Sequence, residues 1–163
     1  MSAYIPVLSL LLVSSGACVT FAAGSLLRSK RRKLSRGMAA LFACMAIYSS
    51  GYALELGARD IGELLAALRY EYVGIALIPA SWLFVVFGFY PSRKPRVPNA
   101  VFLVIPAITI ALVMTVDLHS LYYVEPAMTR IAGLSILSFG RGPWYYVQIA
   151  YLYASIAFGM VAF

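Results

Sequence analysis

Charged residues are scarce in this sequence. Only 12% of its 163 residues are charged and 63% are hydrophobic, whereas a soluble domain carries about 25% charged residues. Long apolar runs make up most of the chain, so its main solvent is lipid. We therefore expect an all-α fold, a polytopic transmembrane helical bundle, and the length leaves no room for a second domain.

Groups that carry out catalysis or bind metals are also scarce. The chain has one histidine and two cysteines, and the sequence shows no Gly-rich phosphate loop and no nucleophile next to a base. We predict that this segment is not an enzyme and uses no cofactor or metal. Cys18 and Cys44 lie inside apolar runs, where each is interpreted as a small core residue, with a disulfide between them as the alternative.

Five apolar runs are candidates for membrane spans, since a helix of about 20 residues crosses the hydrocarbon core. The predicted spans cover residues 3–27, 37–57, 64–90, 99–117 and 144–163. The connection 118–143 is too long for a simple turn, and its apolar content predicts a short hairpin or a packed segment over the mouth of the bundle. The last run reaches Phe163 without a basic anchor, so we expect the sequence to be part of a longer chain.

The basic residues predict the orientation. The net charge of +7 would suit a nucleic-acid partner, but nine of the 13 Lys and Arg residues lie in two short loops, 28–36 and 93–96. Short basic loops face the cytoplasm. We predict no nucleic-acid partner, but a multi-pass protein of the plasma (inner) membrane with its N-terminus outside. All six acids then fall on the outer half. An outer aromatic belt is predicted from Tyr122, Tyr123, Trp144, Tyr145 and Tyr146.

Glu55 and Arg69 are the most informative ionisable residues, because charges inside a membrane need partners. Each lies seven residues from the turn near Gly62. In an antiparallel helical hairpin the two reach the same depth, about 6 to 10 Å below the loop. We predict an ion pair between them, which either fixes the helix register or belongs to a site for a polar or charged ligand. Glu71 should lie on a different face, toward another helix or a second subunit.

Polar side chains also recur at helical spacing on the second and fifth spans. Tyr48, Tyr52 and Glu55 share one stripe, and Gln148 and Tyr151 share another. Side chains with an apolar body and a polar tip suit the lining of a small-molecule pocket. They equally suit hydrogen bonds between helices in lipid, so both interpretations stay open.

Proline and glycine mark other positions along the spans. Pro79 and Pro106 lie within the third and fourth spans, where each removes a backbone hydrogen bond and is predicted to form a fixed bend or a hinge. Gly16 and Gly24 are spaced for a close helix contact on the first span, either inside the bundle or between subunits.

Several segments together resemble the N-terminal seven-transmembrane sensor region of bacterial histidine kinases. The matching segments are 51–56 (GYALEL), 69–74 (RYEYVG), 78–84 (IPASWLF), 115–123 (TVDLHSLYY) and 142–146 (GPWYY). The motif-matching positions are Glu55, Arg69, Pro79, Trp82, Asp117 and His119. The resemblance implies seven helices, of which this sequence supplies about five. It also implies a two-component system, in which a cytoplasmic kinase or other output domain follows.

The function predicted from this resemblance is that of a receptor. We expect it to couple an outer or membrane-borne ligand, an unknown small molecule, to the cytoplasmic output domain, with the bilayer and a second copy of the chain (a homodimer) as further partners. The candidate ligand-binding residues, under the connection 118–143, are Tyr52, Glu55, Arg69, Gln148 and Tyr151. The alternatives are a small membrane transporter or channel subunit and a purely structural membrane subunit.

Overall fold

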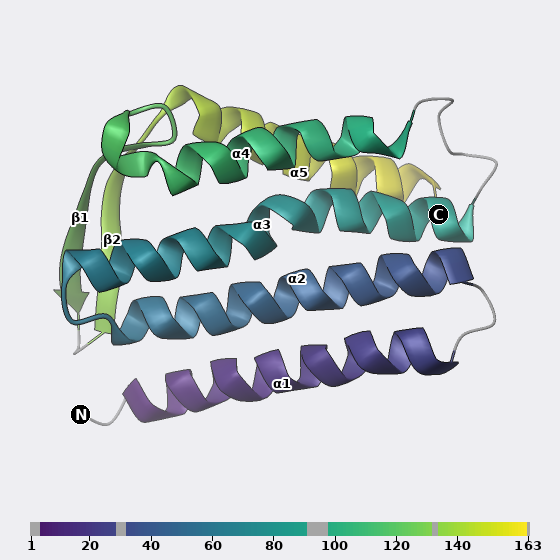
Figure 1. Cartoon of the computed structure of the whole chain (residues 1–163), viewed down its shortest axis with the longest axis horizontal. Helices are drawn as coiled ribbons and strands as arrows, with labels where there is room; N and C mark the ends of the chain where they lie inside the picture. Colours follow the sequence, from purple (N-terminus) through teal and green to yellow (C-terminus); the bar gives the residue numbers. More distant parts are fainter. Residues whose placement is uncertain (1–3, 29–31, 91–97, 132–133, 163) are drawn as a thin grey trace.

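The computed structural model describes residues 4–28, 32–90, 98–131 and 134–162, and it is a bundle of long helices with a β-hairpin across one end (Figure 1). The helices are α1 (Tyr4–Arg28), α2 (Arg32–Gly57), α3 (Ile61–Phe89), α4 (Val104–Met114) and α5 (Pro143–Ala162). Two 3-10 turns flank α4, η2 (Asn99–Leu103) and η3 (Val116–Leu118), and the strands are β1 (Tyr123–Ile131) and β2 (Leu134–Arg141). The predicted all-α helical bundle is confirmed, and the two-stranded sheet is a minor addition.

Four of these helices, α1, α2, α3 and α5, are long and apolar enough to cross a membrane. The fourth predicted span is shorter, because residues 99–114 form one 3-10 turn followed by an α-helix of 11 residues. Pro106 is the third residue of that helix rather than an interior residue. A proline in the first turn breaks no helical hydrogen bond. Pro79 does lie inside α3, and Figure 1 shows that this helix changes direction near its middle.

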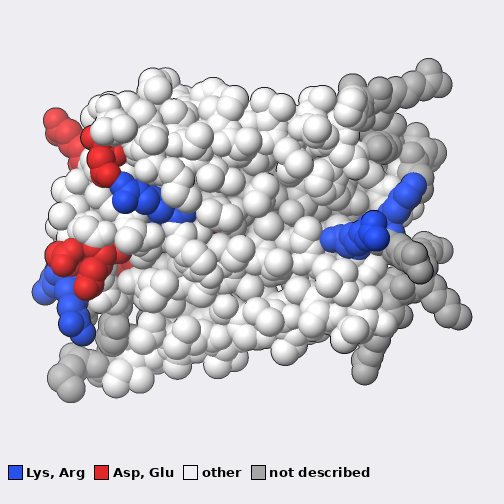
Figure 2. Space-filling model, viewed as in Figure 1, with Lys and Arg blue, Asp and Glu red and all other residues white. Residues whose placement is uncertain are grey.

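The two ends of the bundle differ in charge. We call the end covered by β1 and β2 the hairpin end, and the opposite end, where α2 begins and α3 finishes, the basic end (Figure 1). Figure 2 shows the acidic side chains gathered at the hairpin end, together with some basic ones, whereas only basic side chains are seen among the described residues at the other end. The wide band between the two ends carries no visible charge, as expected of a lipid-facing surface.

Helices α2 and α3 pack closely along their whole length because glycines stand where the backbones meet. A Cβ atom on Gly51 would lie 2.7 Å from the Cα of Glu71, and one on Gly88 would lie 2.8 Å from the Cα of Leu34. Gly37 and Gly74 make equivalent approaches. We call these four residues the glycine seam. In lipid, where apolar burial does not drive association, such close approach supplies the packing that holds helices together.

Helix α1 is attached more loosely. Its contacts with α2 include hydrogen bonds from Ser15 Oγ to the carbonyl of Ala46 (3.1 Å) and from Ser49 Oγ to the carbonyl of Leu11 (3.3 Å). Gly16 and Gly24, predicted as a close helix contact, have no atom of another element within 4 Å of a built Cβ. The version of that prediction that placed the contact inside the bundle is wrong, because neither glycine of α1 comes close to α2.

The connection predicted as a hairpin or a packed segment forms an antiparallel hairpin. Its register runs from Tyr123 opposite Arg141 to Ile131 opposite Leu134, with a bulge between Val124 and Ala127. Glu125, inside the bulge, has a φ of 49°, in the left-handed region. The extra residue there redirects the strand across the helix ends.

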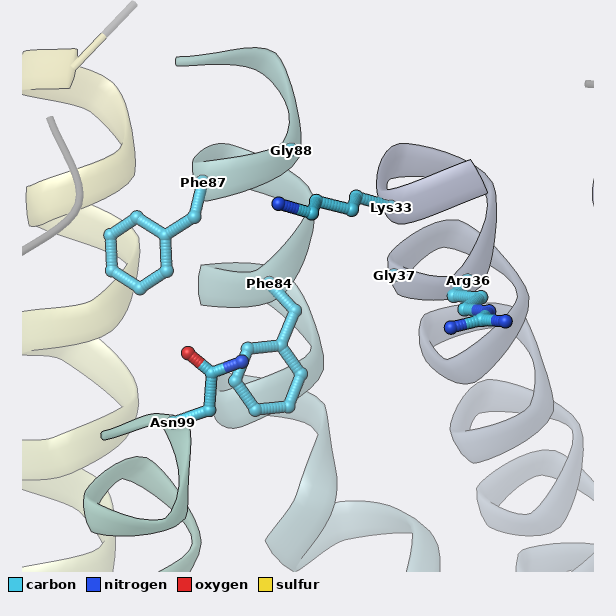
Figure 3. A pocket seen from close by; sticks show the side chains of 7 residues that line it. All are labelled: Lys33, Arg36, Gly37, Phe84, Phe87, Gly88 and Asn99. Carbon is cyan, nitrogen blue, oxygen red and sulfur yellow. The ribbon is translucent and has the colours of Figure 1, made fainter. Parts of the chain in front are cut away.

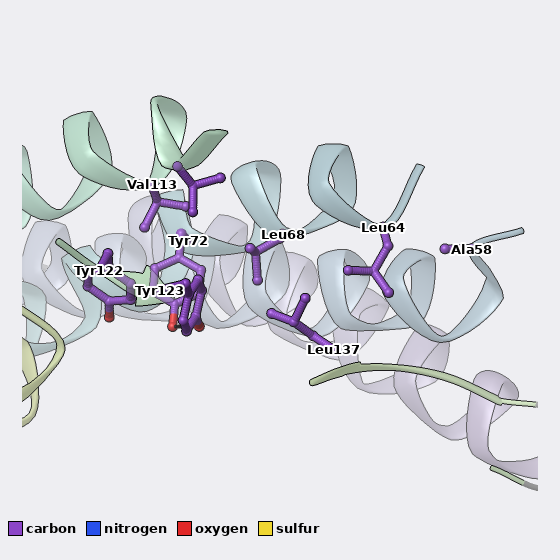
Figure 4. Close-up of a cluster of buried hydrophobic side chains, with 9 residues drawn as sticks. Ala58, Leu64, Leu68, Tyr72, Val113, Tyr122, Tyr123 and Leu137 are labelled. Carbon is purple, nitrogen blue, oxygen red and sulfur yellow. Dashed lines mark hydrogen bonds between the residues drawn. The ribbon is translucent and has the colours of Figure 1, made fainter. Parts of the chain in front are cut away.

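A cluster of buried hydrophobic side chains lies beneath this hairpin (Figure 4). It combines α3, the end of α4 and the hairpin, and its buried members are Ala58, Leu64, Leu68, Tyr72, Val113, Val116, Tyr122, Tyr123 and Leu137. On β2, alternate residues Ser135 and Leu137 are buried, as a strand with one covered face requires. The hairpin is therefore a packed part of the bundle.

Replacement of Gly74 by alanine tests the glycine seam. The new methyl carbon would lie 2.8 Å from the backbone nitrogen of Tyr48, so α2 and α3 must separate. We expect Gly74→Ala to lower the free energy of unfolding by about 1–3 kcal/mol, measured by thermal unfolding in detergent. Gly16→Ala, in open space on α1, is the matched control. Equal unfolding midpoints for the two variants would show that the seam does not stabilise the bundle.

Candidate functional site

Glu55 fastens the hairpin to the helices. It lies in the last turn of α2, is only 6% exposed, and its Oε1 accepts a hydrogen bond from the backbone N–H of Leu137 in β2 (3.3 Å). Two residues earlier on the same strand, the hydroxyl of Ser135 donates to the carbonyl of Ala58. A buried carboxylate and a terminal helix carbonyl each need a partner, and β2 supplies both.

Glu71 on α3 lies beside Glu55. It is 5% exposed, its Cα packs against Gly51, and its carboxyl group lies within electrostatic range of Glu55. Its Oε2 is buried without a hydrogen-bond partner among the described residues. Of the two positions predicted for Glu71, another helix or a second subunit, the structure shows the first. Two carboxyl groups thus meet under the hairpin at the junction of α2, α3 and β2.

The predicted ion pair between Glu55 and Arg69 is wrong. Arg69 Nη2 pairs instead with the carboxylate of Asp117 in η3, and the two side chains are 31% and 52% exposed. Depth along the helix was predicted correctly, but the direction around it was not. Residues two apart on a helix point to nearly opposite sides. Because Glu71 faces α2, Arg69 faces away from it, toward η3.

Gln148 and Tyr151 fasten α5 to the fourth segment. The buried Gln148 accepts a hydrogen bond from Thr109 Oγ1 (2.9 Å), which in turn accepts one from Trp144 Nε1 (2.9 Å). The hydroxyl of Tyr151 donates to the carbonyl of Phe102 (2.7 Å). These are the hydrogen bonds between helices that the sequence offered as the alternative to a pocket lining.

The five predicted ligand-binding residues therefore do not share one set of contacts. Tyr52 stacks on Tyr48, with ring centroids 6.3 Å apart, and it lies within electrostatic range of Glu55 and Glu71. Tyr52 and Glu55 thus belong to one neighbourhood, while Arg69, Gln148 and Tyr151 lie in separate contacts. That any of the five binds a ligand stays a prediction.

A tyrosine cluster supports the hairpin where β1 begins. Tyr72 and Tyr123 are hydrogen-bonded through their hydroxyls, and the ring of Tyr122 packs edge-on against both. Tyr122 and Tyr123 are 1% and 3% exposed, so their predicted place in an interfacial belt is wrong, whereas Tyr146 is 58% exposed. Burial raises the pKa of the Tyr122 and Tyr123 phenols above the ordinary value.

The remaining motif positions are structural contacts. Trp82 Nε1 donates to the carbonyl of Ser155 (3.1 Å), and its ring lies against Gly159, so it joins α3 to α5. His119 accepts the N–H of Leu121 at Nδ1 (3.3 Å) and contacts Thr115 Oγ1 through Nε2 (3.0 Å), which orders the turn before β1.

The sequence did not predict two partners, which are the Leu137 N–H for Glu55 and Asp117 for Arg69. Glu55 accepts from a backbone N–H in β2, and a backbone donor cannot be recognised from the type of its residue. Asp117 was visible as an acid near the end of the fourth run, but only the direction of α3 shows that it faces Arg69. Among the described residues, no three His, Cys, Asp or Glu side chains are grouped to hold a metal ion.

These features define a class: a multi-pass helical membrane protein whose polar groups are concentrated under a cap at one end. The chain belongs to the family described as the N-terminal 7TM region of histidine kinase, whose sequence model matches residues 10–163. It is therefore a sensory transmembrane region of the histidine kinase type, which is a non-catalytic part of such proteins, and the resemblance seen in the sequence is confirmed. No curated protein and no solved structure matches the chain.

A double-mutant cycle tests which acid pairs with Arg69. For Arg69→Ala combined with Asp117→Ala we expect a coupling energy of about 0.5–1 kcal/mol, the range of partly exposed ion pairs. The cycle of Arg69→Ala with Glu55→Gln is the control and should be additive. The unfolding free energies of the single and double variants, measured in detergent, give both coupling energies. Coupling to Glu55 and none to Asp117 would restore the original pairing.

The buried tyrosines predict a loss of stability in alkali. The unfolded phenols ionise near pH 10, whereas burial holds Tyr122 and Tyr123 protonated in the folded state. Their contribution is fully present below about pH 10 and is lost as the pH rises above it. We expect the unfolding temperature to fall less steeply between about pH 9.5 and 11 in Tyr122→Phe than in the unmodified protein. Parallel slopes would contradict the buried placement.

Proposed function

We propose that this chain is the signal-sensing region of a histidine kinase, in which the hairpin end receives an extracytoplasmic or membrane-borne ligand and the basic end connects to a cytoplasmic output domain. The observation that carries the proposal is the docking of the hairpin onto a buried glutamate. A surface element whose docking includes a few polar contacts to the helices can be released or reseated by a ligand.

The distribution of charge supports this orientation. All six acids belong to elements of the hairpin end or to the helix ends beneath it, while Lys33 and Arg36 are the described cations of the basic end. The two basic sequence clusters flank the same end. Basic loops are retained in the cytoplasm, so the hairpin end, and the N-terminus beside it in Figure 1, are assigned to the outside.

The polar contacts under the hairpin suit a switch between two arrangements. Glu55 holds β2, Arg69 holds η3, and both helices that carry them meet at the glycine seam. A ligand shifts such an equilibrium only by its difference in affinity for the two arrangements. The Oε2 of Glu71, which has no hydrogen-bond partner among the described residues, offers an acceptor to a ligand with a hydrogen-bond donor or a positive charge.

Helix α3 is the route by which such a change would cross the membrane. It carries Arg69, Glu71 and Tyr72 at the hairpin end, and near its other end Trp82 contacts α5 and Gly88 contacts α2. A displacement of α3 under the hairpin would therefore shift α5 and α2 at the basic end. Pro79 lies between these two groups of contacts, which supports a hinge role for it.

Cysteine accessibility tests the orientation. Ser138 in β2 and Ala100 in η2 are both exposed and lie at opposite ends. In a background where Cys18 and Cys44 are alanine, we expect Ser138→Cys to react with a membrane-impermeant maleimide in intact cells. Ala100→Cys should react only after lysis. The reverse labelling pattern would sink the proposed orientation.

Substitution of Glu55 tests the role of hairpin docking in signalling. Removal of the acceptor leaves the Leu137 N–H unpaired at a cost of about 1–3 kcal/mol. In the complete kinase we expect Glu55→Leu to shift basal autophosphorylation strongly in one direction, while Glu55→Gln, which keeps an acceptor oxygen, stays near the unmodified level. Ser138→Ala, on the outward face of β2, is the matched control. Unchanged signalling in correctly folded Glu55→Leu would contradict the proposal.

A further inference from the structure

A pocket lies at the basic end, far from the site under the hairpin. Its cavity volume is about 380 Å³, and its lining comes from the beginning of α2, the end of α3 and η2. The lining residues are Lys33, Arg36, Gly37, Phe84, Phe87, Gly88 and Asn99. Figure 3 shows the Lys33 side chain extending from α2 toward α3, which carries Phe84, while Asn99 comes from η2.

The positive charge of this pocket has no acidic partner among the described residues. Lys33 and Arg36 are three residues apart on α2, so they lie on the same side of the helix. Both are exposed, and neither forms an ion pair among the described residues. All six acids lie in elements at the other end of the bundle. An anion from outside the chain is therefore the natural partner of these two cations.

The other walls of the pocket are apolar. Phe87 is buried and contacts the rings of Phe102 and Phe158, at centroid distances of 5.4 and 5.8 Å. Phe84 is partly exposed beside it. Gly37 and Gly88, which line the pocket, belong to the glycine seam, where the backbones of α2 and α3 meet. A ligand that fits must carry a negative head and an apolar body.

We propose that this pocket binds an anionic phospholipid of the cytoplasmic leaflet. Its phosphate lies between Lys33 and Arg36 and accepts from the amide of Asn99, and its acyl chains follow the apolar surface beside Phe84. Basic pockets between transmembrane helices on the cytoplasmic side are suited to anionic headgroups, and the volume is in the range of small-ligand sites. The assignment to the cytoplasmic leaflet rests on the orientation proposed above.

Native mass spectrometry of the complete chain, released from detergent with added lipid, tests the site. We expect phosphatidylglycerol to be retained, and phosphatidylcholine to bind at least about tenfold more weakly. Each cation near an anionic lipid contributes about 1 kcal/mol, so Lys33→Gln with Arg36→Gln should weaken phosphatidylglycerol binding roughly ten- to thirtyfold. Lys33→Arg with Arg36→Lys keeps the charge and should retain binding.

A charge-matched double variant at the hairpin end, Arg59→Gln with Arg130→Gln, is the control and should leave binding within about twofold. Equal losses in the two neutralised variants, or equal retention of the two lipids, would overturn the site. Displacement of the lipid by millimolar inorganic phosphate would overturn the lipid as its occupant.

Lipid binding is measured without a signalling readout. A negative result would therefore not contradict the sensor function, which the Glu55 variants test. Reversed maleimide labelling would change the leaflet and leave the chemistry of the site intact.

Discussion

The close approach of α2 and α3 is the constraint on which the other features depend. Four glycines allow the two backbones to meet along their whole length, at the acidic site under the hairpin and at the pocket of the basic end. At the hairpin end, Gly51 brings Glu71 next to the helix that carries Glu55. At the basic end, Gly37 and Gly88 bring the two helices together beside the pocket that Lys33 lines. In lipid such packing replaces the hydrophobic drive of a soluble core.

The hairpin addresses a second constraint, which is that buried polar groups in a membrane protein need partners from the chain itself. A backbone N–H of β2 reaches Glu55, and a serine of the same strand reaches the end of α2. On the other side, Asp117 reaches Arg69. The cap is thus attached by a few polar contacts around an aromatic cluster, an arrangement that can be both stable and responsive.

Composition was sufficient to predict the helical bundle, and a resemblance of short motifs pointed to its family. The apolar runs mark α1, α2, α3 and α5 because lipid demands long uncharged helices. The short motifs around Glu55, Arg69 and Trp82 gave the family through their order. The strands at 123–131 and 134–141 could only be offered as one alternative, since their alternation is weak and appears only once the strand lies across the helix ends.

The pairing of side chains was the feature of the structure that the sequence predicted least well. Sequence spacing gives depth along a helix, but the direction of a side chain depends on which face packs, and Gly51 decides that for α3. The most direct measurement of the account is the hydrogen-exchange rate of the Leu137 amide. We predict strong protection of this amide, lost in Glu55→Leu, while that of the exposed Ser138 is unchanged. If the Leu137 amide exchanges equally fast in the unmodified protein and in Glu55→Leu, Glu55 does not hold the hairpin.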